Sequence, residues 1–258
     1  MGGKAYSQRG STGTWVASML PSDTSVCYVE PFAGMLGVLL QRPRCANELV
    51  NDLDRNIYTW WKAIRERPDE LLHRIRHTPM SRVVFNEARA LLASAGGGDI
   101  ERAWAAHTVL RQSLLHGLSA QSWGRTFDTT KKYNADMEHL ERIVERVQHV
   151  QLECMDALEL VRGCVDKPRV LLYADPPYRD ADHVYGVDTL DRGAFASVLR
   201  EFKGCAAISG YGDEWDDLGW ERHVFATAYS RTDESGIVEQ SARTEVLWTN
   251  YTVQARMF

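Results

Sequence analysis

Residues 170–178 read VLLYADPPY, which is a run of five apolar residues followed by an aspartate, two prolines and a tyrosine. A short apolar run without alternation is typical of a strand buried on both faces of a parallel sheet. Two prolines end such a strand because they have no amide donor and a fixed φ. Asp175, a backbone carbonyl and Tyr178 therefore follow the carboxyl end of a strand, which is where open α/β sheets bind their ligands.

Two earlier segments predict the start of the same sheet. Residues 26–30 (VCYVE) form an apolar run that ends in the loop PFAGMLG (31–37), and residues 38–40 are apolar again. This order predicts a strand, a glycine turn and a helix. Residues 48–52 (ELVND) predict a second strand that ends in a carboxylate, Asp52. A strand, a helix and a strand with a terminal carboxylate are the opening of a nucleotide-binding α/β unit.

The pattern becomes helical from Asn56 onward. Apolar residues recur at helical spacing with a break at Pro68, and Asp99 is a plausible N-cap after three glycines. We predict helices over residues 56–75, 81–92, 99–115 and 136–147, with a polar irregular segment at 117–135. After this we predict strands at 150–154, 170–174, 206–209 and 244–250 and a helix at 193–202. The sequence thus predicts a catalytic α/β domain over 1–55 and 150–258, and a helical insert over 56–149.

Composition limits the class of protein. The chain has 258 residues, 44% of them apolar, and no apolar run long enough for a signal peptide or a membrane span. Its five cysteines include no C-x-x-C pair, which fits a reducing, cytoplasmic location and predicts no metal site. The net charge is −5, but residues 57–150 carry 14 basic and 11 acidic side chains against 16 and 24 in the remainder. This asymmetry is compatible with DNA contact by the middle segment and equally with a solvated helical face.

The DPPY segment (Asp175-Pro176-Pro177-Tyr178) suits chemistry on the amino group of a base. Such a nitrogen is a poor nucleophile because its lone pair is delocalised into the ring. Acceptors on both hydrogens, here Asp175 and the Pro176 carbonyl, would push density onto nitrogen, and Tyr178 could stack on a flipped base. The alternative is a strand-terminating turn with an ordinary capping aspartate.

Four further features bear on ligand binding, and the last three of them each have two interpretations. Small residues in the loop 31–37 let a ligand approach the backbone. Asp52 either accepts hydrogen bonds from a ribose diol or caps a helix. Asp156 either contacts an adenine ring or caps a helix over 157–161. Lys4 either holds a carboxylate or is simply solvated.

In this order the segments resemble the Dam-like, DPPY-containing group of DNA adenine-N6 methyltransferases, especially those of phages and actinobacteria. GGK (2–4), YVEPFAG (28–34), ELVND (48–52), DPPY (175–178), ISGYGDEWD (208–216) and TEVLWTNY (244–251) carry the resemblance, which covers nearly the whole chain. It implies a Rossmann-like sheet that binds S-adenosylmethionine, with a helical insert as the target-recognition region. It also implies that Lys4, Phe32, Gly34, Asp52, Asp156 and Asp175 bind the cofactor and that Asp175, Pro176, Pro177 and Tyr178 form the catalytic site.

The sequence departs from the family at two places. Leu36 stands where the family's F-x-G-x-G motif has its second glycine, so the turn is expected to differ locally. The chain also begins at Met1, so the contact of the aromatic residue that often precedes GGK in the family is expected either to be missing or to come from elsewhere.

The resemblance implies double-stranded DNA as the partner, no membrane association, and a monomer or weak dimer. Within 117–135 we predict DNA contacts by Ser122, Trp123, Arg125, Lys131 and Lys132, against the alternative of a surface loop packed on the insert. The rival functions are methylation of cytosine N4, RNA or protein by the same fold, and a catalytically weak DNA-binding homologue. Asp175 favours adenine. A restriction-linked enzyme and a solitary phage or host enzyme remain equal alternatives.

Overall fold

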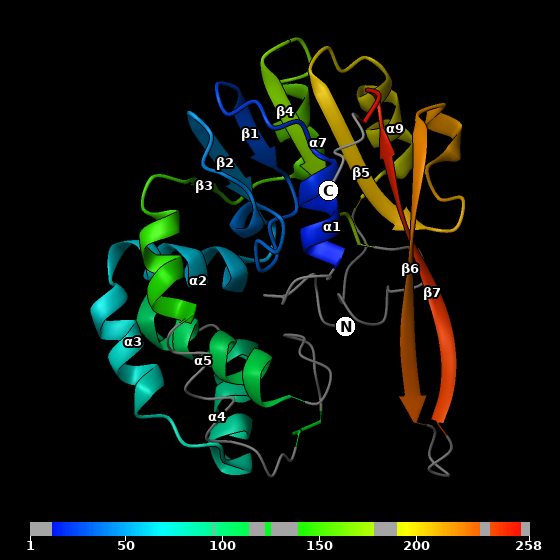
Figure 1. Cartoon of the computed structure of the whole chain (residues 1–258). Coiled ribbons are helices and arrows are strands. Elements are labelled where there is room, and N and C mark those ends of the chain that lie inside the picture. The colour runs from blue at the N-terminus through cyan, green and yellow to red at the C-terminus, as the bar shows by residue number, and fades with distance from the viewer. Residues whose placement is uncertain are drawn as a thin grey trace.

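The computed structural model describes residues 12–94, 96–113, 122–124, 139–177, 190–232 and 238–253, with side chains left out at 226–232 and 238–243. Within these residues seven strands form one sheet in the order β3-β2-β1-β4-β5-β7-β6 (Figure 1). The strands are β1 (Cys27–Glu30), β2 (Asn47–Asn51), β3 (Gln151–Glu153), β4 (Val170–Ala174), β5 (Cys205–Tyr211), β6 (Glu221–Thr232) and β7 (Val238–Thr249). No helix in the described part of the chain is long and apolar enough to cross a membrane.

Strands β1 to β5 are parallel, and β7 runs antiparallel to both β5 and β6. The chain starts at the centre with β1, moves outward to β2 and β3, and then returns to β4 on the other side of β1. Loops that leave β1 and β4 therefore diverge in opposite directions, which opens a crevice at their carboxyl ends. Asp175, directly after β4, lies at this switch point.

Strand β4 has the two-sided burial that its sequence predicts. All five of its residues are buried. Leu171 and Tyr173 belong to one core cluster, and Leu172 and Ala174 belong to the cluster on the opposite side. Because successive side chains of a strand point to opposite faces, both faces of β4 are covered.

Helices cover the two faces of the sheet. The cluster with Leu172 includes buried residues of α7 (Ala157–Arg162) and α9 (Arg192–Arg200). The cluster with Tyr173 includes residues of α1 (Thr12–Met19), of the insert helices and of residues 139–147, which are helical. The sheet is thus the middle layer of an α/β sandwich, as predicted.

The insert between β2 and β3 is helical and lies below the β2–β3 side of the sheet (Figure 1). It contains α2 (Arg55–Glu66), α3 (Pro68–Arg76), α4 (Arg82–Ala93), α5 (Asp99–Gln112) and the helical residues 139–147. Pro68 occupies the first turn of α3, which is where the predicted break falls. The Arg146 guanidinium then binds the Glu48 carboxylate on β2 through two hydrogen bonds of 2.5 and 2.7 Å, and so ties the end of the insert to the sheet.

Two predicted elements differ in the structure. The helix expected after the glycine turn is only a 3-10 turn, η1 (Leu39–Gln41), because Pro43 and the start of β2 at Asn47 leave no room for a longer helix. The strand predicted at 244–250 is the end of the much longer β7. Strands β6 and β7 pair along twelve residues each and extend past β5 as a two-stranded ribbon (Figure 1).

Candidate active site at the carboxyl edge of the sheet

The loops that follow β1, β2 and β3 are joined by one side chain, Asn51. Its amide nitrogen donates to the carbonyls of Pro31 (2.9 Å) and Met155 (3.0 Å), and its amide oxygen accepts from the Met155 backbone N–H (2.9 Å). Asn51 is buried at 1% exposure. A buried amide with both ends bonded fixes the relative positions of the loops. The predicted site residues that flank these loops are therefore held in one rigid edge.

Asp52 lies in this edge and is not a helix cap. Its two carboxylate oxygens accept from the backbone N–H groups of Gly34 (2.8 Å) and Asp54 (2.9 Å), while Asp54 is the residue that caps α2. Burial raises the pKa of Asp52 to about 6. A carboxylate has about four acceptor positions, so two remain after these two bonds. These two remaining acceptor positions are available to the two hydroxyl donors of a ribose diol, which fits that interpretation of Asp52.

The glycine turn keeps a left-handed backbone at two positions. Gly34 has φ +45°, and a Cβ built there would meet no atom within 4 Å, which leaves open space beside the turn. Leu36, at the position of the family's second glycine, also has a positive φ of 55°. The backbone conformation that favours glycine is thus retained by a leucine.

Burial of the Leu36 side chain offsets this strain. The left-handed region costs a non-glycine residue about 1–2 kcal/mol. The Leu36 side chain is 0% exposed within the main core, and burial of a leucine contributes about 2–3 kcal/mol. The turn is further held by the Trp61 indole N–H, which donates to the Gly34 carbonyl at 2.8 Å. Leu36 is therefore accommodated in a left-handed turn that its own burial and the Trp61 hydrogen bond stabilise.

The remaining predicted residues have different environments. Asp156 caps α7, since its Oδ1 accepts from the Glu159 backbone N–H at 3.0 Å, and it is exposed. Phe32 is half-buried and packs edge-on against Phe195 with ring centroids 5.6 Å apart. Pro176 is buried and Asp175 and Pro177 are half-buried directly after β4. Lys4, Tyr178, Arg125, Lys131 and Lys132 lie outside the described residues.

Glu30, the last residue of β1, is a candidate that sequence reasoning missed. It is 2% exposed and accepts a hydrogen bond of 2.5 Å from the Tyr28 hydroxyl. The pKa of Glu30 is raised to about 8, mainly by burial and in smaller part by the negative charge of Asp175. The buried Glu30 carboxyl group therefore interacts electrostatically with Asp175. Its only signal in the sequence is a charged residue at the end of an apolar run.

This buried acid predicts a pH dependence of stability. The folded protein keeps the Glu30 proton up to about pH 8, whereas the unfolded chain loses it near the ordinary value of 4.5. The free energy of unfolding must therefore fall as the pH rises through this window. We expect Glu30→Gln to remove the dependence, so that the variant gains about 4 kcal/mol relative to the parent between pH 5 and pH 9. Urea unfolding at both pH values measures this difference, with the exposed Glu201→Gln as control, and parallel curves for Glu30→Gln and the parent would contradict it.

Comparison with known proteins shows the family of the chain. A family model described as D12 class N6 adenine-specific DNA methyltransferase matches residues 13–216. The chain belongs to this family. This D12 methyltransferase is thus an S-adenosylmethionine-dependent enzyme of adenine N6 methylation in DNA, as the sequence predicts.

Solved structures align with the chain at low identity and with TM-scores below 0.5. Precorrin-6y C5,15-methyltransferase from Geobacter metallireducens aligns with 8% identity and a TM-score of 0.42, covering 95% of this chain and 91% of that one. A precorrin 8W decarboxylase from Methanobacterium thermoautotrophicum aligns with 11% identity and a TM-score of 0.40, covering 92% and 87%. An S-adenosylmethionine-dependent methyltransferase from Agrobacterium tumefaciens aligns with 9% identity and a TM-score of 0.39, covering 93% and 60%. No curated protein matches the sequence.

Proposed function

We propose that the D12 methyltransferase acts on double-stranded DNA with two separate sets of residues. Lys4, Phe32, Gly34, Asp52, Asp156 and Asp175 bind S-adenosylmethionine, and Asp175, Pro176, Pro177 and Tyr178 form the site of the adenine amino group. Residues 56–149 contact the DNA. The observation that carries this proposal is that Gly34, Asp52 and Asp175 follow the neighbouring parallel strands β1, β2 and β4, with Gly34 bonded to Asp52.

The cofactor supplies an electrophilic methyl group on a sulfonium. Asp175 and the Pro176 carbonyl accept the two amino hydrogens of adenine, which favours a pyramidal nitrogen with an available lone pair. With the cofactor bound, this nitrogen would take up the methyl group that the sulfonium releases as it becomes a neutral thioether. The proton then leaves the methylated nitrogen for the Asp175 carboxylate or water. Fixed acceptors of this kind act through preorganisation and positioning.

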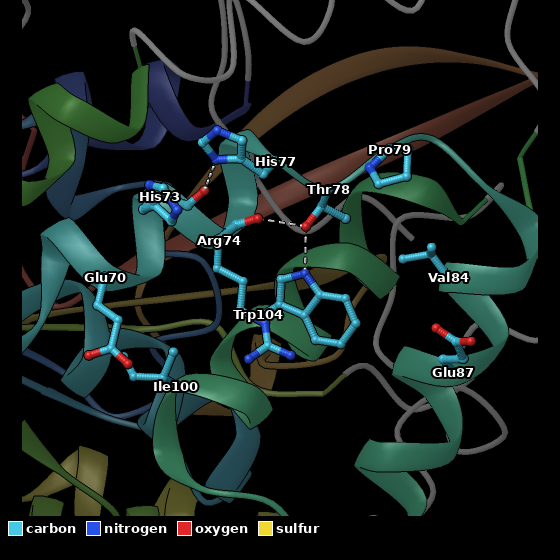
Figure 2. Close-up of a pocket in the computed structure, with 10 residues that line it drawn as sticks. All are labelled: Glu70, His73, Arg74, His77, Thr78, Pro79, Val84, Glu87, Ile100 and Trp104. Atoms are coloured by element: carbon cyan, nitrogen blue, oxygen red, sulfur yellow. Dashed lines mark hydrogen bonds between the residues drawn. The ribbon is translucent and has the colours of Figure 1, made fainter.

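A surface pocket on the insert supports its role in DNA contact. It has a volume of about 480 Å³ and lies between α3, α4 and α5 (Figure 2). The Arg74 guanidinium stacks over the Trp104 ring at 4.6 Å, and the Trp104 indole N–H donates to the Thr78 hydroxyl at 2.7 Å. Stacking holds the planar guanidinium in place and leaves its N–H groups available to a phosphate. His73 and His77 line the same pocket and are exposed.

Two carboxylates also line the pocket, and one of them is already engaged. Glu70 accepts hydrogen bonds from Arg67 at 3.0 and 2.5 Å, so its charge is balanced outside the pocket. Glu87 is the second. We propose Arg74 as the phosphate contact of this face. Of the loop residues predicted to contact DNA, Ser122 is exposed, whereas Trp123 packs on the core of the insert with Arg82 over its ring at 5.2 Å.

A paired binding experiment tests whether separate residues bind the cofactor and the DNA. We expect Asp52→Asn to weaken S-adenosylmethionine binding by about 10–100-fold, because a hydrogen bond to a charged group contributes about 1.5–3 kcal/mol. Its affinity for a duplex should stay unchanged. Arg74→Gln should do the reverse, with duplex affinity falling several-fold for every sequence and the salt dependence losing about one unit of slope. Calorimetry with the cofactor and fluorescence anisotropy with a labelled duplex measure the two affinities.

Each variant has a matched control. Asp54→Asn alters the neighbouring helix cap, and Arg76→Gln alters an exposed arginine of α3 that pairs with Glu141 and does not line the pocket. Both controls should keep both affinities. If Asp52→Asn binds the cofactor as the parent does, the ribose role is wrong. If Arg74→Gln keeps its duplex affinity and salt slope, the phosphate contact is wrong.

The cellular setting belongs to the same proposal. All five cysteines lie in described segments and are free thiols, which suits a reducing cytoplasm of a bacterial or phage-infected cell. The enzyme acts there as a monomer or weak dimer, either beside a restriction nuclease or alone.

A further inference from the structure

Arg192, the first residue of α9, touches the catalytic motif from outside it. Its guanidinium donates one hydrogen bond to the Pro177 carbonyl and another, of 2.6 Å, to the Glu214 carboxylate. The side chains of Arg192 and Glu214 are 16% and 5% exposed. A largely desolvated guanidinium with a fixed carboxylate partner is a rigid donor, so the Pro177 carbonyl is held by a fixed group.

The partner of Arg192 is itself held in place by β5 and the turn that follows. The second oxygen of Glu214 accepts from the Tyr211 backbone N–H at 3.3 Å. A Cβ at Gly210 would lie 2.8 Å from that oxygen and 2.9 Å from the Trp215 ring, so only glycine allows this approach. The Arg192 guanidinium also lies 5.7 Å from the centre of the Trp215 ring. We call Arg192 and Glu214, with their hydrogen bond to the Pro177 carbonyl, the clamp. The backbone of residues 210–211 and the Trp215 ring restrict its movement.

Through the backbone, the clamp on the Pro177 carbonyl also affects the Pro176 carbonyl of the proposed amino-group site. Pro177 has a fixed φ, so the plane of the Pro176–Pro177 peptide and the direction of the Pro177 carbonyl differ by one soft torsion, ψ of Pro177. Holding the Pro177 carbonyl restrains that torsion. It also restrains the direction of the Pro176 carbonyl before it and of the chain that continues to Tyr178.

We propose that Arg192, oriented by Glu214, is a positioning residue that sets the direction of the Pro176 carbonyl toward the adenine amino group. This inference rests on the proposed role of Pro176 as an amino-hydrogen acceptor. Arg192 touches neither cofactor nor base in this account. It acts through the backbone of the motif, 15 residues earlier in the chain.

A second ion pair joins the same two segments and serves as the comparison. Arg200, also on α9, binds Asp217 at 2.5 Å, and its side chain is 43% exposed. This pair links α9 to η3 (Asp216–Leu218) without contacting the motif. Arg200→Met therefore reports the general effect of removing an arginine and its ion pair from α9. The larger stability cost of breaking the buried Arg192–Glu214 pair is read separately from thermal unfolding.

The test compares Arg192→Met, Arg192→Lys and Arg200→Met in full-length protein with a duplex substrate. We expect Arg192→Met to lower kcat by about 10²-fold, the cost of a small misplacement of reacting groups. Its Kd for S-adenosylmethionine and for DNA should stay within about threefold of the parent. Arg192→Lys, which keeps one donor and the charge, should recover part of kcat. Arg200→Met should keep kcat, and thermal unfolding gives the folded fraction of each variant.

Three results would overturn the positioning role. One is a kcat for Arg192→Met within about twofold of the parent. Another is a loss of kcat that follows the folded fraction or appears equally in Arg200→Met. The third is a Kd for cofactor that rises as much as kcat falls. Asp175→Ala in the same assay separates a failure of the proposed function from a failure of the positioning role. If Asp175→Ala keeps the parent kcat, the proposed amino-group site is wrong. If Asp175→Ala loses activity but Arg192→Met keeps the parent kcat, only the positioning role of Arg192 is wrong.

Discussion

Replacement of Asp175 by alanine should abolish methyl transfer to adenine, with kcat falling by about 10³-fold or more. Loss of a preorganised hydrogen-bond partner in an active site costs about 10²–10³-fold. In the proposed mechanism, Asp175 would also provide the charge next to the methylated nitrogen. Initial rates with radiolabelled S-adenosylmethionine and an unmethylated duplex measure the effect.

Two companion variants make this result specific. Asp175→Asn keeps one amide oxygen as an acceptor but loses the charge, so its rate should lie between those of the parent and Asp175→Ala. Asp166→Ala removes an exposed carboxylate that pairs with Lys203, and it should keep the parent rate. Equal rates for Asp175→Ala and Asp166→Ala would show that the amino group is activated elsewhere.

Replacement of Arg146 by methionine should lower the free energy of unfolding by about 3–5 kcal/mol. Glu48 has a side chain only 3% exposed, and Arg146 neutralises it through two hydrogen bonds. Removing one partner of a buried ion pair leaves an uncompensated charge, and this is the source of the cost. Arg146 also donates to the Leu39 carbonyl at 3.1 Å, beside the glycine turn. Urea unfolding monitored by tryptophan fluorescence measures the change.

The charge explanation is separable from simple loss of a side chain. In the double variant Arg146→Met and Glu48→Leu no charge is left buried, so most of the lost stability should return. Arg142→Met, on the same helical segment but exposed, should change stability by less than about 0.5 kcal/mol. A double variant less stable than Arg146→Met alone would contradict the account.

The strands of the catalytic edge could be predicted because their signals are local. VLLYA is buried on both faces of the sheet, and DPPY follows it without any need for knowledge of distant residues. The break at Pro68 is equally local, since a proline is compatible with a first helical turn and with no later one. Burial and proline geometry act within a few residues, so the sequence alone carries them.

The contacts that hold the site together could not be predicted in this way. Asn51 bonds Met155, which is 104 residues away, and Arg192 bonds Pro177 across an intervening segment. These partners become neighbours only through the strand order of the sheet. The long ribbon of β6 and β7 was missed for a related reason, because twelve paired residues are set by the partner strand as much as by local propensity.

The central claim is that this enzyme places a methyl group on the N6 nitrogen of adenine in DNA through Asp175. The most direct test is nucleoside mass spectrometry of unmethylated plasmid after incubation with S-adenosylmethionine and either the parent protein or Asp175→Ala. The account predicts N6-methyladenine with the parent and none with Asp175→Ala. Methylcytosine as the product, or N6-methyladenine formed equally by both proteins, would contradict it.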